Sequence, residues 1–315
     1  MTRTADRVVS LSDAVAGIAE GWNLTFGGFA HLMGPMALVR ELIRAGKRNL
    51  ALTGVAECWA ADMLAGAGAL RQVRFSNFMF EGYGRCRNFC REVEEGRLPV
   101  EDHSHFGLAN RLAAAGLGVP FLPIRSMAGT DIVNVSGFEE PAAKWATVQD
   151  PFGGEPVTVV SAVSPDAAII HAQRADRAGN VQVFGTTAVI EEQARAAQRV
   201  IVSVEEIVDS SELRRHPEAT LIPSFLVDAV VEVPFGAHPN GTFRYYQHDP
   251  AHIARYYAAS RASDTFAAYL DEWVYGPNDH WAYLDKVGVP HLMSLRVDPF
   301  LNYIPRDMAQ SEAAR

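Results

Sequence analysis

A short apolar strand that runs into two glycines constrains the fold of this chain more than any other feature. Residues 24–26 form a strand pattern, Gly27 and Gly28 follow directly, and Pro35 opens a run with helical periodicity. Proline suits the first position of a helix because its missing N–H needs no partner there. The pattern therefore predicts a buried strand, a tight turn and a helix, the place at which an open α/β sheet offers backbone N–H groups to a ligand.

The same alternation of strand and helix continues along the chain. Strand patterns at 49–53 and 73–78 alternate with helical patterns at 36–46 and 56–64. This rhythm predicts a mainly parallel sheet covered by helices, which is an α/β fold. Further strands are expected at 119–124, 157–161, 167–171, 181–184, 200–204 and 227–233, and further helices at 12–20, 84–95, 104–115 and 188–197. Ser12 and Asp13 are expected to cap the first of these helices.

Two segments depart from this rhythm. Residues 126–154 contain Gly, Pro and polar residues without a period, so we expect a long loop there. After Pro239 aromatic and polar residues dominate, with helical patterns at 251–262 and 264–273. We expect an α/β domain over residues 1–240 and a helical C-terminal extension over residues 241–315 that packs on the same domain.

Composition excludes several classes of partner. The 315 residues carry 28 basic and 37 acidic side chains, a net charge of −9, and no Lys/Arg cluster stands out along the sequence, which argues against nucleic-acid binding. No apolar run approaches the roughly 18–20 residues of a membrane span, and the first residues lack a signal-peptide pattern. Cys58, Cys86 and Cys90 form no disulfide framework. We therefore expect a cytoplasmic protein without a membrane or nucleic-acid partner.

The glycine turn has two interpretations. Gly27 and Gly28 could let a ligand approach the backbone closely, and the N–H groups near a helix start would favour an oxyanion such as that of a thioester or anhydride intermediate. Alternatively, the glycines serve only a tight connection between strand and helix. The turn lacks Gly-Lys-Ser/Thr and the third glycine of the dinucleotide fingerprint.

Two carboxylates are the other candidates for chemistry. In Glu101-Asp102-His103-Ser104-His105, Ser104 could cap the helix that follows. Glu101 could hold a substrate or act as a general base, or could simply cap that helix with Asp102 and face water. Glu81 follows an apolar strand, where open α/β sheets place ligands, and its aromatic neighbours could raise its pKa. The alternative for Glu81 is a solvated loop acid. The spacing of the His, Cys and acidic residues gives no metal site.

A complete hydrolase site is poorly supported by the sequence. There is no Gly-x-Ser-x-Gly elbow, and no serine or cysteine stands in a triad context. His171 ends a buried apolar strand, where a core histidine with satisfied hydrogen bonds is the more common explanation.

Several segments together resemble the A (α) chains of family I CoA-transferases, most closely the glutaconate CoA-transferase branch. The resemblance covers nearly the whole chain. The segments that carry it are Gly27-Gly28-Phe29 with Pro35, Gly118-Val119-Pro120-Phe121-Leu122-Pro123, Ile170-His171-Ala172-Gln173, Val204-Glu205-Glu206-Ile207, Phe235-Gly236-Ala237-His238-Pro239 and Asp271-Glu272-Trp273.

The resemblance implies an open α/β sandwich and covalent catalysis by a glutamate carboxylate. That glutamate belongs to the B (β) chain of such enzymes, in a Ser-Glu-Asn-Gly type motif that this sequence lacks, and Glu205-Glu206 belongs to the A-type segment instead. The resemblance thus implies a B-type partner, a hetero-oligomer, an acyl-CoA and a carboxylic acid as substrates, and no cofactor beyond the CoA thioester itself.

The resemblance also implies where the substrates lie. Gly27, Gly28, Phe29, Ala30 and His31 are expected to line the acyl site. Glu81, Glu101, Ser126, Gly129 and Thr130 are expected to border the pocket for the acid. The apolar run Phe78-Met79-Phe80 replaces polar sequence of the glutaconate branch and suggests a bulkier or more apolar acid. As an alternative, the chain resembles components of ring-opening CoA-thioester hydrolases, in which Glu101 would be catalytic.

Overall fold

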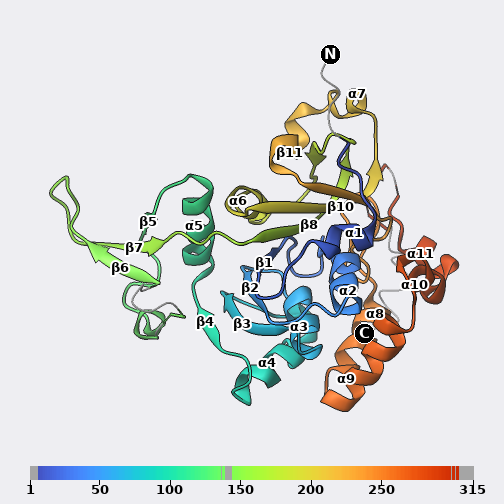
Figure 1. Cartoon of the computed structure of the whole chain (residues 1–315), viewed down its shortest axis with the longest axis horizontal. Coiled ribbons are helices and arrows are strands. Elements are labelled where there is room, and N and C mark those ends of the chain that lie inside the picture. The colour runs from blue at the N-terminus through green and yellow to red at the C-terminus, as the bar shows by residue number, and fades with distance from the viewer. Residues whose placement is uncertain (1–5, 136, 139–143, 299, 302, 305–315) are drawn as a thin grey trace.

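A mainly parallel β-sheet forms the centre of the fold (Figure 1). The computed structural model describes residues 6–135, 137–138, 144–298, 300–301 and 303–304. Within this part of the chain, nine strands form the sheet. Seven of them pair in parallel, in the order β12, β10, β8, β1, β2, β3 and β4. Strand β9 pairs antiparallel with β8, and β11 pairs antiparallel with β9. Their bounds are β1 Asn23–Phe26, β2 Leu50–Gly54, β3 Leu70–Phe75, β4 Val100–Asp102, β8 Ala167–Ala175, β9 Val181–Gln182, β10 Arg199–Ile207, β11 Thr220–Ile222 and β12 Ala229–Glu232.

Strand β1 is where the order of strands changes direction. Strands β2 to β4 follow one another on one side of β1, whereas β8 and β10 lie on the other side. In open α/β sheets this switch point is where ligands bind, beyond the carboxyl ends of the strands. The glycine turn follows β1 directly, so the fold places it at this point.

Both faces of the sheet are covered by helices, as the near-continuous apolar strands require. Ile169 of β8 packs in one core with α2 (Met36–Arg44) and α3 (Trp59–Gly66), whereas its neighbour Ile170 packs in a second core with α6 (Ile190–Ala196). Neighbouring strand residues point to opposite faces, so one strand supplies both cores. Helix α5 (His105–Gly116) packs beside α6, and α4 (Arg87–Glu94) beside α3.

A second, antiparallel sheet was not expected. Strands β5 (Phe121–Ile124), β7 (Val157–Ser161) and β6 (Trp145–Val148) form it at the side of the molecule (Figure 1). The prediction of one long loop over residues 126–154 is therefore wrong, because β6 and the 3₁₀ turn η2 (Asp131–Asn134) lie within it. Most side chains of β6 are exposed, so its sequence carries no apolar alternation.

The C-terminal helices complete the first core. They are α8 (Pro250–Ala259), α9 (Ser263–Leu270), the π-helix η5 (Asp271–Tyr275), α10 (His280–Val287) and α11 (Val289–Leu295). The Tyr256 ring lies 4.7 Å from that of Trp59, and its hydroxyl donates to Asp62 at 2.7 Å. The helical C-terminal region is thus confirmed, whereas the domain boundary at residue 240 stays a prediction.

Two helix starts differ from the prediction, and the first is that of α2, where Pro35 is the residue before the helix rather than its first residue. Ser104 caps α5 by accepting the N–H of Gly107, as predicted. Helix α1 (Leu11–Ala16), however, is capped by Ser10 rather than by Ser12 and ends before the predicted residue 20. Within the described residues, none of the helices combines the length and apolar character needed to cross a bilayer. The short remaining elements are η1 Glu81–Tyr83, α7 Ser210–Leu213, η3 Pro217–Ala219 and η4 Ser224–Leu226.

Candidate functional site

Backbone hydrogen bonds to β8 and within the turn hold the glycine turn in place. The N–H of Gly27 donates to Ile169 O of β8 at 2.9 Å, and that of Phe29 to Leu32 O at 2.9 Å. Gly28 has φ +117°, and a Cβ there would lie 2.9–3.0 Å from the backbone of Gly34. Packing alone therefore explains this glycine. The N–H groups of Gly28 and His31 make no hydrogen bond within the described part of the chain, so they remain available as donors.

Replacing Gly28 by alanine is expected to lower the free energy of unfolding by about 1–3 kcal/mol, because the new Cβ meets both a strained φ and a close backbone. Gly82→Ala is the control, since a Cβ at Gly82 meets nothing within 4 Å and φ is not positive there. Denaturant unfolding measures both. Equal stability of the two variants would contradict the packing of the turn.

His31 is a neutral, fixed side chain at the end of the turn. The indole N–H of Trp59 donates to His31 Nδ1 at 3.0 Å, and Nε2 lies 3.3 Å from Phe80 O, so the proton belongs on Nε2. Burial lowers the pKa of His31, an effect that the charge of Glu81 partly opposes. Glu81 itself is exposed, at the start of η1. The structure thus brings the turn and Glu81 together around Phe80.

Glu101 is buried in the last strand of the sheet rather than at a helix end. Its Oε1 accepts hydrogen bonds from Arg111 Nη1 at 2.6 Å, His103 Nε2 at 2.7 Å and Arg74 Nε at 3.1 Å. Its Oε2 accepts the N–H of Phe138 at 2.9 Å. The interpretation of Glu101 as a solvated helix cap is therefore wrong, and Ser104 does the capping.

This network also bears on the chemistry of Glu101. Burial alone would raise its pKa, but the hydrogen bond from His103, the charge of Arg111 and the Phe138 N–H together hold the pKa well below its usual range. A carboxylate with a low pKa and engaged oxygens is a weak general base. Its hydrogen bonds support a role in holding this edge of the sheet.

The remaining predicted residues lie beside this edge. Ser126 Oγ is 3.0 Å from Ser104 Oγ, and Gly129 and Thr130 are exposed beyond it. Strand β4 lies three strand positions from β1, about 14 Å at ~4.8 Å per strand. The structure therefore divides the predicted site into two groups: Gly27 to His31 with Glu81, and Glu101 with residues 126–130.

A buried carboxyl group behind the turn was missed by the sequence analysis. Glu57 follows β2 and accepts the N–H groups of Trp59 at 2.7 Å and Ala60 at 2.9 Å. Burial raises the pKa of Glu57 to about 8, so the group is mostly protonated at neutral pH. A Cβ on Gly34 would lie 3.2 Å from Glu57 Oε1 and 2.4 Å from Asn240 Nδ2, so both polar groups face that backbone. The position of Glu57 at the end of a strand was the available signal.

His171 is a core histidine, as expected, but it lies in an arrangement that the sequence did not reveal. Its Nδ1 is 2.9 Å from Ser203 Oγ and its Nε2 is 2.8 Å from Glu205 Oε1. These are the residue types of a hydrolytic triad. All three are buried, and Tyr246 OH and the Phe235 N–H also donate to Glu205. The group therefore ties β8 to β10 and the segment after β12.

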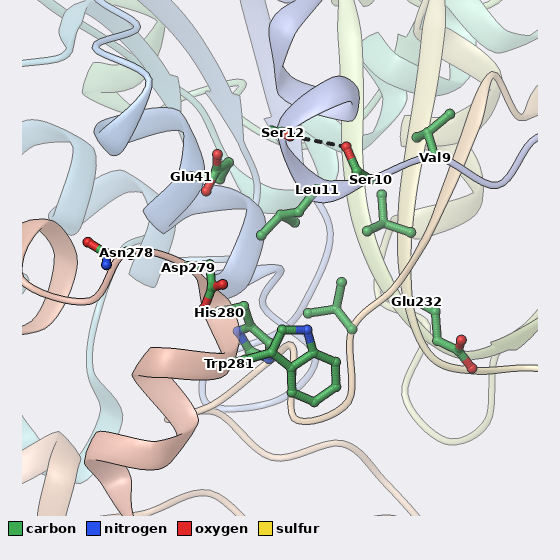
Figure 2. Close-up of a pocket in the computed structure, with 12 residues that line it drawn as sticks. Val9, Ser10, Leu11, Ser12, Glu41, Glu232, Asn278, Asp279, His280 and Trp281 are labelled. Carbon is green, nitrogen blue, oxygen red and sulfur yellow. Dashed lines mark hydrogen bonds between the residues drawn. The ribbon is translucent and has the colours of Figure 1, made fainter.

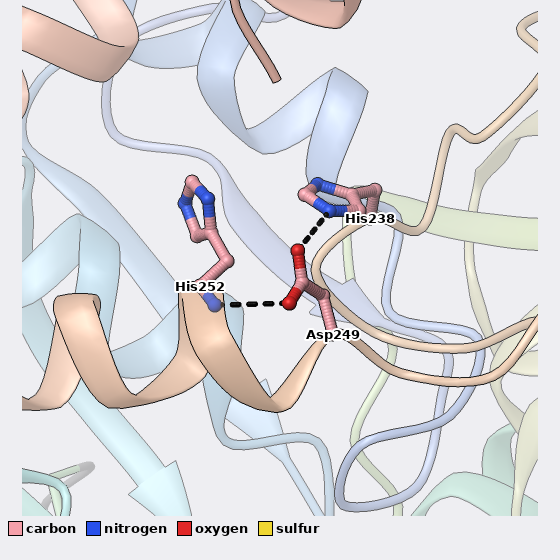
Figure 3. A group of neighbouring side chains, drawn as sticks. All are labelled: His238, Asp249 and His252. Carbon is pink, nitrogen blue, oxygen red and sulfur yellow. Dashed lines mark hydrogen bonds and ion pairs between the residues drawn. The ribbon is translucent and has the colours of Figure 1, made fainter. Parts of the chain in front are cut away.

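A second buried histidine cluster joins the C-terminal helices to the domain. His238, Asp249 and His252 have potential ligand atoms within 4.8 Å of one another (Figure 3). Their polar atoms already have partners: His238 bonds Tyr283 OH at 2.7 Å and Asp249 at 3.1 Å, and His252 bonds Tyr269 OH at 2.8 Å. These hydrogen bonds give the cluster a structural role. That the site needs no metal stays a prediction.

A separate cavity of about 410 Å³ lies beside the edge strand β12 (Figure 2). None of the predicted site residues lines it. Its polar lining comes from the N-terminal segment, α2, β12 and the start of α10, and includes Ser10, Ser12, Glu41, Glu232, Asp279 and Trp281.

Comparison with known proteins gives a consistent result. The sequence profile of the family described as "Coenzyme A transferase" matches residues 8–233. A protein of Archaeoglobus fulgidus is 40% identical over 90% of this chain, which spans 63% of that protein's length. The A-type component of the 3-oxoadipate CoA-transferase of Pseudomonas knackmussii is 36% identical over 86% of this chain and 94% of its own.

The third relative is glutaconate CoA-transferase of Acidaminococcus fermentans. Its A-type component is 35% identical over 94% of this chain and 97% of its own length. The crystal structure of that enzyme superposes on this chain with a TM-score of 0.91 and 34% identity, and covers 96% of this chain and 99% of the matched chain. The open α/β fold with its helical C-terminal region is thereby confirmed.

Proposed function

Because the chain belongs to the coenzyme A transferase family, we propose that it is the A-type component of a heteromeric enzyme that moves CoA between an acyl-CoA and a carboxylic acid. One observation carries this proposal. The similarity to named A-type components extends over nearly the whole chain, while the Ser-Glu-Asn-Gly type motif of the nucleophile is missing from the sequence. The attacking carboxylate therefore belongs to a B-type partner.

The geometry of the glycine turn fits the supporting role. A partner carboxylate attacks the thioester carbonyl, and CoA leaves as a thiolate, which gives an acyl-glutamyl anhydride. The thiolate then attacks the anhydride at the glutamyl carbonyl and expels the donor acid as its carboxylate, which leaves a glutamyl-CoA thioester. The acceptor carboxylate passes through the same two steps in reverse, which forms the new acyl-CoA and frees the glutamate. Each addition places negative charge on a carbonyl oxygen. The N–H groups of Gly28 and His31, which have no hydrogen-bond acceptor within the described residues, are donors for this oxygen.

The ring-opening hydrolase is less well supported. The two relatives above that carry functional names are transferase components. In addition, Glu101 is the catalytic candidate of that alternative, and its pKa is lowered. Its two carboxylate oxygens accept hydrogen bonds from four donor groups of other residues.

The proposal predicts that turnover needs two chains. The purified chain alone should show no exchange of CoA between an acyl-CoA and added acids, whereas co-expression with a B-type partner should restore exchange. During turnover, hydroxylamine should trap a glutamyl-CoA thioester on the B-type partner only. Exchange by the isolated chain, or a thioester trapped on this chain, would contradict the proposal.

We also place the enzyme in the cytoplasm and expect a hetero-oligomer. The three cysteines are free thiols in the structure, as a reducing compartment favours. Residues Phe78 to Phe80 make the region near the turn apolar, so we propose a bulkier or more apolar acid than a short dicarboxylate.

A further inference from the structure

Four arginines, three from residues 85–91 and one from the distant position 261, meet in one surface pocket, which we name the arginine pocket. It has a volume of about 560 Å³ between α4 and the end of α8. Its charged lining consists of Arg85, Arg87, Arg91, Arg261 and one carboxylate, Glu94. The chain as a whole carries a net charge of −9, so the excess of positive charge in this pocket is opposite in sign to the charge of the whole chain.

Two of the guanidinium groups are fixed in place by α8. Arg87 lies over the Tyr257 ring, 3.7 Å from its centroid, and donates to Tyr257 O at 3.0 Å. Arg91 donates to Ser260 O at 3.1 Å and to Asn88 Oδ1 at 2.5 Å. A guanidinium has five N–H donors, so these bonds leave donors free on both groups. The guanidinium groups of Arg87 and Arg91 are therefore held in position and still have N–H donors available for a ligand.

The positive charge of the pocket is neutralised only in part within the described residues. Glu94 pairs with Arg85, and among the described residues Arg87, Arg91 and Arg261 form no ion pair with a carboxylate. Arg91 Nε is also buried without a hydrogen-bond partner in the described structure. Fixed guanidinium groups of this kind bind phosphate oxygens through paired N–H donors.

The pocket is connected to the glycine turn by a short series of aromatic contacts. The His31 ring stacks on Phe80 with centroids 6.1 Å apart, and Phe80 meets the Tyr257 ring at 6.3 Å. Tyr257 is the residue on which Arg87 lies. In CoA the thiol and the phosphates are separated by the long pantetheine arm, so a ligand with its thioester at the turn has a flexible arm with which to reach this pocket.

We infer that the arginine pocket binds the phosphate groups of the CoA thioester, an inference that rests on the proposed function for its choice of ligand. Phosphate groups supply the negative charge that the described side chains lack, and Tyr257 offers an aromatic wall beside them. Acidic side chains of the B-type partner are the alternative occupant, and the experiment below separates the two.

The direct test uses the full chain and adenosine 3′,5′-bisphosphate, the nucleotide part of CoA. Calorimetry should show binding of this compound that is at least tenfold weaker in the double variant Arg85→Ala/Arg261→Ala. Both arginines are exposed, and the ion pair of Arg85 with Glu94 is a surface pair of small energetic weight, so the fold should persist. The control is Arg48→Ala/Arg71→Ala, which removes two exposed arginines near the amino ends of β2 and β3. Unchanged affinity in the pocket variant, or equal binding of adenosine and its bisphosphate by wild type, would overturn the inference.

The kinetic test uses the complex with the B-type partner. The pocket variant should raise KM for acyl-CoA about tenfold and leave KM for the matching acyl-pantetheine, which has no phosphates, unchanged. An equal change with both substrates, or loss of the complex in gel filtration, would overturn the inference and assign the pocket to the partner. The binding test needs no turnover, so failure of the transferase proposal and failure of the pocket are distinguishable.

Discussion

Replacing Glu101 by alanine is expected to lower the free energy of unfolding by about 3–5 kcal/mol, because it removes a buried carboxylate that forms ion pairs with two buried guanidinium groups. Arg74 and Arg111 are each about 5% exposed or less, so water cannot replace the lost partner. Denaturant unfolding at neutral pH measures the effect. Below the ordinary pKa of 4.5, the wild-type protein should itself lose this stabilisation as Glu101 becomes protonated, since its folded pKa is lowered.

Two variants make this test specific. Glu101→Gln keeps the shape and an acceptor for the Phe138 N–H but removes the charge, so its loss should fall between that of alanine and wild type. Glu191→Ala breaks an exposed ion pair with Arg195 and should cost no more than about 0.5 kcal/mol. If Glu101→Ala were as mild as Glu191→Ala, the buried network would not exist in solution.

Glu57 is expected to make stability fall with rising pH. Its pKa is about 8 in the folded chain and near 4.5 when unfolded, so the folded state binds more protons between these values. The free energy of unfolding should therefore decrease by up to about 1.4 kcal/mol per pH unit over that window. Glu57→Gln removes the titrating group, so its stability relative to wild type should rise from pH 5 to pH 8 and level off above it.

The difference between variant and wild type is the informative quantity, because other groups titrate in both proteins. Glu20→Gln, which removes one carboxyl group at an exposed position, is the control. A constant difference for Glu57→Gln would show that the carboxyl group is hydrated in the folded protein.

Local sequence pattern was sufficient to predict the main parallel sheet. The apolar runs of β8 and β10 could be read directly, because parallel strands buried on both faces contain few polar residues. The cap at Ser104 was equally visible. Strand β6 was not, since its side chains are largely exposed and its identity depends on pairing with β7.

The site was predicted less completely, because its decisive contacts join distant parts of the chain. The glycine turn and Glu81 follow strands, and the structure has both beside Phe80, whereas their role in substrate binding stays a prediction. The burial of Glu101 depends on Arg74 and Phe138, and the arginine pocket depends on Arg261, which only the tertiary fold brings near α4. Local sequence pattern cannot predict contacts between residues that are this far apart in the sequence. Glu57 could have been found, since it too follows a strand.

The contact between Tyr256 and Asp62 joins residues that are 194 positions apart in the sequence. Trp59, beside them, has 0% exposure in the finished protein. During synthesis on the ribosome, the apolar side of α3 therefore stays exposed to solvent until α8 has left the ribosome. Cells that make this protein should need a chaperone, or the early arrival of a binding partner, to keep such nascent chains from aggregating.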